Sequence, residues 1–203
     1  MRDSARFDAF YRDARDRLLV QTFALTGDSE AARRAVQQAF VVAAHHWRKL
    51  ERMDDPETVV RPHAWRLAQR RASTRLFHRE RTADPQSAAI VEALGNLPTA
   101  QRKALLLTQF AAVTMEQMAR EIGLPLEQAE RELQHGAAQL SLTLEVPVAG
   151  LRAAFDHLGT TTTAPWPRTT IIERSGTRRR RAHSLIGAAG AGAGRRGPGG
   201  VRR

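Results

Sequence analysis

Arginine dominates one stretch of the chain, between positions 61 and 81. The stretch contains one acidic residue, Glu80, and two aromatic residues that fall between the basic ones, Trp65 and Phe77. Guanidinium groups neutralise phosphates, and aromatic rings stack on unpaired bases. The stretch therefore predicts a contact with single-stranded nucleic acid, with a solvated basic helix face as the alternative. Its arginines are Arg61, Arg66, Arg70, Arg71, Arg75, Arg79 and Arg81.

Residues that hold metals or attack substrates show no such concentration. The sequence has no cysteine, which excludes disulfides, thiolate zinc sites and a cysteine nucleophile. His45 and His46 are adjacent, and adjacent side chains on a helix point about 100° apart. The glycine-rich residues 187–194 follow arginines rather than a strand and lack phosphate-loop spacing. We expect no catalytic residue, metal or cofactor, and a protein that is not an enzyme.

The net charge of +11 is unevenly distributed along the chain. Residues 1–90 carry +5, residues 91–167 carry −3, and residues 168–203 carry +9. The first residues alternate acids and arginines without an apolar run, so they do not form a secretory signal. With no apolar run of about 18 residues that could span a bilayer, we expect a cytoplasmic protein.

Apolar residues recur at helical spacing through most of the chain, which predicts an all-α fold. A first helix covers Phe7 to Leu25 and ends at Gly27, and Asp28 caps a second helix that extends to Trp47. Pro62 suits the first turn of a third helix. These helices form a first domain, residues 1–81.

A second helical block follows an expected linker at residues 82–91, and we expect few contacts between the two blocks. Leu97–Pro98 introduces a helix that extends to Phe110. Thr114 caps a short helix, with Gln117 placed for a capping box, and Gly123 begins the turn into a helix over 126–144. This short helix, turn and longer helix have the pattern of a helix-turn-helix, although any helical hairpin gives the same pattern. The second domain is residues 92–145.

Residues 146–203 are expected to be a basic extension that is mostly disordered, apart from one weak amphipathic segment from Val148 to Leu158. Arg178–Arg181 precede Leu185–Gly194, which as a helix would rise about 15 Å, half of a hydrocarbon core of about 30 Å. We expect weak attachment to anionic membranes through Arg174 and Arg178–Arg181 without insertion. A disordered tail that contacts nothing, or contacts DNA nonspecifically, is the alternative.

The order of these motifs resembles the two conserved domains of the extracytoplasmic-function sigma factor family over residues 6–144. The matching segments are Gly27–Glu30, Val36–Phe40, Trp47–Leu50, Pro62–Arg71, Leu97–Pro98 with Gln101–Arg102, and the helix-turn-helix pattern. The resemblance implies a sigma region-2-like three-helix domain and a region-4-like helix-turn-helix domain. It implies core RNA polymerase and promoter DNA as partners, an anti-sigma factor as a further partner, and no chemistry of its own. In that family the first domain opens the promoter and the second recognises the −35 element.

The resemblance also implies site residues. The expected DNA-binding residues are Arg66, Arg70, Arg71, Arg75 and Arg79 in the first domain and Arg131 and His135 in the second. The expected polymerase-binding residues are Glu30, Arg34, Gln37 and Gln38.

Two departures from the family pattern favour other functions. Arg33 and Arg34 stand where the family has acids. In the helix-turn-helix pattern, residues 114–140 hold five acids, Glu127, Glu130 and Glu132 among them, against two arginines, a net charge of −3. Acids on a helix oppose its entry into a groove lined by phosphates. The alternative is a regulatory protein with the sigma fold that acts through protein contacts. A third hypothesis is an unrelated helical module that binds membranes or nucleic acid through its tail.

Overall fold

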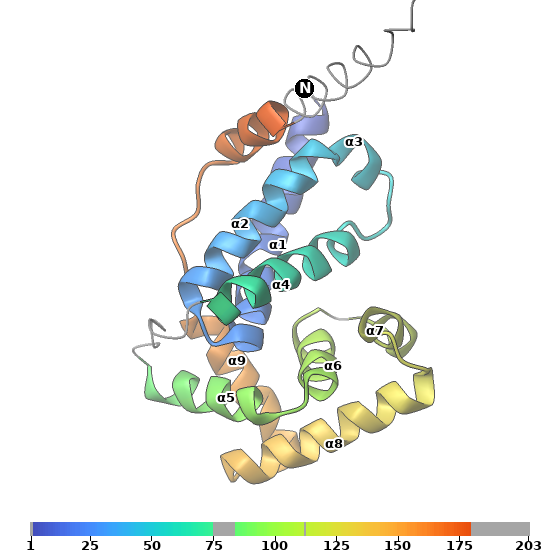
Figure 1. Cartoon of the computed structure of the whole chain (residues 1–203), viewed down its shortest axis with the longest axis vertical. Coiled ribbons are helices and arrows are strands. Elements are labelled where there is room, and N and C mark those ends of the chain that lie inside the picture. Colours follow the sequence, from blue (N-terminus) through green and yellow to red (C-terminus); the bar gives the residue numbers. More distant parts are fainter. Residues whose placement is uncertain (1, 75–83, 112, 180–203) are drawn as a thin grey trace, which may run out of the picture.

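The computed structural model describes residues 2–74, 84–111 and 113–179 (Figure 1). Throughout these ranges the secondary structure is helical, without strands, which confirms the all-α prediction. A helix over residues 169–179 follows the last labelled one. The labelled elements are α1 (Arg2–Thr26), α2 (Ser29–His45), α3 (Trp47–Leu50), α4 (Glu57–Thr74), α5 (Pro85–Asn96), α6 (Thr99–Phe110), α7 (Met115–Ile122), α8 (Leu126–Leu144), the 3-10 turn η1 (Val148–Gly150) and α9 (Leu151–Thr161).

Several helix ends follow the expected local signals. Gly27, with φ of 70°, ends α1, and the Asp28 carboxylate accepts the Ala31 N–H at 2.8 Å to begin α2. Thr114 and Gln117 form a complete capping box at the start of α7. Gly123, with φ of 78°, ends α7 in the left-handed conformation that glycine adopts without a steric penalty.

Helix α4 begins five residues before Pro62, so the expectation that Pro62 lies in the first turn was wrong. Asp55 starts the helix instead, because its carboxylate accepts the Glu57 N–H at 2.9 Å and its carbonyl accepts the Thr58 hydroxyl at 2.7 Å. Pro62 therefore lies inside α4 and lacks the N–H of an ordinary helical residue.

Helix α5 occupies most of the expected linker. Asp84 accepts the Ser87 N–H at 2.7 Å, and Pro85 takes the first helical position, so residues 85–91 are helical. Residues 82 and 83 lie outside the described part of the chain.

The two helical blocks share a core, so the expectation of few contacts between them was wrong. Leu19, Phe23 and Leu25 at the end of α1 and Trp65 of α4 are buried in one cluster with residues of α5, α6, α8 and α9. Arg102 of α6 reinforces the junction, because its guanidinium donates to the carbonyl oxygens of Leu25, Gly95 and Leu97 at 2.9, 2.6 and 3.0 Å. A second cluster joins the start of α1 to α2, α3 and α4.

The chain after α8 folds back onto the molecule. The expected amphipathic segment, residues 148–158, forms η1 and most of α9, whereas residues 159–179 differ from the expected disorder. Leu151, Phe155 and Leu158 of α9 are buried in the shared core. Residues 162–168 then lead in an extended path to the helix of residues 169–179, beside α1 and α2 (Figure 1). Residues 180–203, including Arg180, Arg181 and the glycine-rich segment, lie outside the described residues. Within the described ranges, no helix has the length and apolar character needed to cross a bilayer.

Candidate nucleic-acid interface

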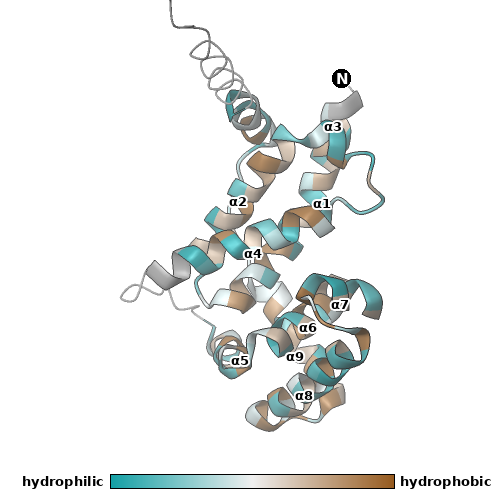
Figure 2. Cartoon of the chain, turned by 45° about the vertical axis from the view of Figure 1, so that its right-hand side comes forward, coloured by the Kyte–Doolittle hydropathy of each residue, from teal (hydrophilic) through white to brown (hydrophobic). Residues whose placement is uncertain are grey.

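Three basic side chains share one face of α4. His63, Arg66 and Arg70 are spaced three and four residues apart, and the two arginines are exposed. Burial lowers the pKa of His63, and the nearby charges of Arg66, Arg179 and Arg70 lower it further. Arg179 comes from the C-terminal helix, so the positive potential at this face has two sources. Figure 2 shows hydrophilic and apolar segments alternating along α4, as expected for a helix with one buried face.

The rest of the arginine-rich stretch divides into buried and undescribed residues. Trp65 is buried in the shared core, so it cannot stack on a base as its position in the sequence indicated. Arg61 is 1% exposed and is likewise unable to contact phosphate. The structure does not describe the remaining members of the stretch, which are the Arg71 side chain, Arg75, Phe77, Arg79 and Arg81.

Arg61 belongs to a charged network inside the molecule. Its guanidinium donates to Glu57 at 3.1 Å and pairs with Glu121 of α7, while Arg17 of α1 donates to Glu57 at 2.7 Å. Burial raises the pKa of Glu121, and the nearby Arg61 opposes that shift. The network therefore ties α1, α4 and α7 together.

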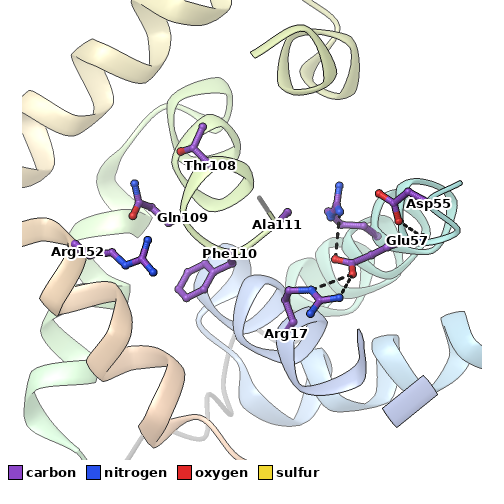
Figure 3. Close-up of a pocket in the computed structure, with 9 residues that line it drawn as sticks. Arg17, Asp55, Glu57, Thr108, Gln109, Phe110, Ala111 and Arg152 are labelled. Atoms are coloured by element: carbon purple, nitrogen blue, oxygen red, sulfur yellow. Dashed lines mark hydrogen bonds and ion pairs between the residues drawn. The ribbon is translucent and has the colours of Figure 1, made fainter. Parts of the chain in front are cut away.

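A cavity of about 520 Å³ lies beside this network. Figure 3 shows Arg17 and Glu57 on one side of it and Phe110 and Arg152 on the other. Glu57 already accepts hydrogen bonds from Arg17 and Arg61, so its carboxylate serves the ion pairs rather than acid–base chemistry. Among the described residues, no cluster of His, Asp or Glu could hold a metal ion.

The solvent face of α8 carries both expected contact residues and one acid. Arg131 and His135 are exposed four residues apart, and Glu127 precedes Arg131 at the same spacing. Glu130 and Glu132 are partly buried and lie about 100° to either side of Arg131. Only Glu127 among these acids therefore shares the face on which a groove contact would form.

The expected polymerase-binding residues lie along α2, but the acid among them is already engaged. Glu30 accepts hydrogen bonds from Arg33 at 2.8 and 2.9 Å and pairs with Arg34. These hydrogen bonds lower the pKa of Glu30 to about 2, and the bond from Arg33 has the largest effect. Gln37 and Gln38 are partly buried, and Arg34 is exposed.

Comparison with known proteins gave no match to a family model, to a curated protein or to a solved structure. A function is therefore inferred from the charges and contacts of the chain itself.

Proposed function

We propose that the protein is a sigma-factor-like transcription initiation factor that directs core RNA polymerase to promoters, with α4 as its contact to single-stranded promoter DNA. The observation that carries the proposal is the basic face of His63, Arg66 and Arg70. The exposed guanidinium groups of Arg66 and Arg70 attract phosphates, which release their counterions on binding.

The arrangement of α7 and α8 supports the same proposal. A capped short helix, a turn at a left-handed glycine and a longer helix are the elements of a helix-turn-helix, and both pack on α6. Because Glu127 lies beside Arg131 on the exposed face of α8, this unit contributes little to duplex affinity. Most of the DNA binding is assigned to α4.

Glu30 and Glu127 favour a second candidate, a regulator that acts through protein contacts. Glu30 is neutralised by its own neighbours, which weakens electrostatic attraction to a basic polymerase surface. Glu127 opposes groove binding but suits a cationic protein partner. Under this candidate the basic face of α4 is only a solvated surface.

The test of the proposal is the affinity of the full chain for a fluorescent single-stranded oligonucleotide, measured at several salt concentrations. The double variant Arg66→Gln with Arg70→Gln should weaken binding at least tenfold. It should also reduce the slope of log affinity against log salt concentration by roughly 1.4, because each of the two lost phosphate contacts contributes about 0.7. Arg12→Gln with Arg152→Gln removes the same charge from exposed positions elsewhere and should change little.

An equal loss of DNA affinity in both double variants would mean that only the net charge of the protein matters. It would then contradict the assignment of α4 as the DNA-binding site. Co-purification with core polymerase then separates the two candidates. DNA binding through α4 together with polymerase binding supports an initiation factor, whereas polymerase binding without DNA binding supports the regulator.

A further inference from the structure

Residues 162–179, called the strap below, pass along α1 in the opposite direction to it. Trp166 donates from Nε1 to Asp16 at 2.6 Å, and the carbonyl of Pro167 accepts the Tyr11 hydroxyl at 3.0 Å. Thr169 donates to Asp8, and Glu173 accepts the Ser4 hydroxyl at 2.8 Å. As the residue number rises along the strap, the number of its partner on α1 decreases from 16 to 4. The contacts therefore form one continuous antiparallel path.

The strap helix lies between α1 and α2. Ile172 is 1% exposed and is buried in the cluster that contains Phe7 of α1 and Phe40 of α2. Gly176 lies against α2 so closely that a Cβ atom there would stand 2.9 Å from the Ala44 Cβ and 3.0 Å from the Val41 carbonyl oxygen. Only a residue without a side chain fits this position unless α2 or the strap shifts.

The strap is held less firmly than the helix before it. Helix α9 buries three large apolar side chains, whereas the strap helix buries one, Ile172. The bonds from Trp166 to Asp16 and from Ser4 to Glu173 are exposed to water. An element with few buried contacts and an extended connection opens more readily than the core around it.

The part of α2 beneath the strap continues the face expected to bind polymerase. Val41 and His45 follow Arg34, Gln37 and Gln38 at helical spacing, so these residues form one stripe along the helix. Gly176 lies against the C-terminal end of that stripe. A helical partner that bound along the whole stripe would collide with the strap.

We propose that the groove between α1 and α2 is a binding site for a protein helix and that the strap is its detachable occupant within the chain. The helix that fits has an aliphatic residue followed four positions later by glycine, as Ile172 and Gly176 are arranged. The strap is covalently attached, so a free helix competes with a high local concentration and binds only after the strap is displaced. The identification of that partner with polymerase rests on the proposed function; the groove and its occupant do not.

The test compares two glycine substitutions in the full chain. Gly176→Ala places a methyl group against Ala44, whereas Gly159→Ala in α9 meets only a Phe110 ring atom at 3.9 Å. Hydrogen exchange of residues 169–179 reports whether the strap is released. Binding of a fluorescent peptide with the sequence of residues 162–179 reports whether the groove is then available. Ile172→Ala is a second way to weaken the strap that leaves α1 and α2 unchanged.

Gly176→Ala should accelerate exchange in the strap at least tenfold and raise affinity for the peptide at least tenfold over the original chain. Gly159→Ala should do neither, and a peptide that itself carries Gly176→Ala should not bind. If both Gly176→Ala and Ile172→Ala release the strap without any gain in peptide binding, the groove is not a binding site for a helix and the proposal is wrong.

Polymerase binding is measured on the same variants. If the released variants bind the peptide but not polymerase, the proposed function fails and the groove stands. If they bind polymerase more tightly than the original chain does, the strap and polymerase share this surface.

Discussion

Arg61 of α4 and Glu121 of α7 form an ion pair that is largely withdrawn from water, with side-chain exposures of 1% and 12%. The pair joins helices from the two blocks, and Glu57 and Arg17 extend it to α1. An arginine that looks in the sequence like one of several phosphate contacts is therefore part of the interior.

The Arg61–Glu121 pair predicts a large loss of stability when its cation is removed. Arg61→Met leaves the Glu121 carboxylate partly buried without its partner, which should reduce the free energy of unfolding by about 3–5 kcal/mol. Urea denaturation measures this difference. Adding Glu121→Gln to the Arg61→Met variant should recover part of the loss, because the uncompensated charge is then absent.

Arg152→Met is the control for that experiment. It breaks the pair between Arg152 and Asp156, whose side chains are 69% and 62% exposed, and should change stability by only about 0–1 kcal/mol. Equal effects of Arg61→Met and Arg152→Met would contradict a structural role for Arg61.

Gly123 and Gly95 predict opposite effects of the same substitution. A Cβ atom at either position has open space around it, so only the backbone conformation differs. Gly123→Ala forces alanine into φ of 78° and should destabilise the protein by about 1 kcal/mol. Gly95→Ala, within α5, should stabilise it by roughly 0.5–1 kcal/mol. Thermal denaturation of both variants decides the matter, and effects of the same sign would contradict the turn geometry.

The lowered pKa of His63 predicts DNA binding that strengthens in acid. In the free protein, burial and nearby arginines disfavour the protonated ring, so His63 is mostly neutral at pH 7. Phosphates next to the ring stabilise its cation and raise the pKa, so binding takes up a proton. Affinity for single-stranded DNA should therefore rise as pH falls from 7.5 to about 5.5. His63→Gln should flatten this dependence, and an unchanged slope in that variant would place the DNA away from His63.

The exposed face of α8 predicts unequal effects of reversing its acids. Glu127 shares that face with Arg131, whereas Glu132 is turned about 100° away. Glu127→Lys should raise duplex affinity several-fold, and Glu132→Lys, with the same change in net charge, should raise it less. Fluorescence anisotropy with a duplex oligonucleotide measures both, and equal gains would show that the orientation of α8 is irrelevant.

Local signals predicted the helix ends well, because each depends on a few neighbouring residues. Asp28, Thr114 and Gly123 act at their own helix ends wherever the rest of the chain lies. Pro62 was misleading because proline is favoured in a first turn, whereas here it lies inside α4, where it forgoes one backbone hydrogen bond of the helix. The start of α5 was predictable from Asp84–Pro85 and was missed because the surrounding residues are polar.

Burial within α4 required knowledge of what packs against it. Arg61 lies on the same stripe as Ala64, Trp65 and Ala68, which was visible in the sequence. The stripe alone could not show that an acid from α7, sixty positions later, would meet the arginine. The position of the strap was equally hidden, because its hydrogen bonds to α1 join residues 150 to 169 positions apart.

The last residues of α1 have a consequence for how the protein can be dissected or recombined. Leu19, Phe23 and Leu25 belong to the first block by sequence but complete the interior of the second. A fragment that ends after α4 would present these side chains and Trp65 to water, and a fragment that begins at α5 would lack them. Neither half can therefore be exchanged alone, and a chimera should inherit α1, α4 and residues 84–161 from the same parent.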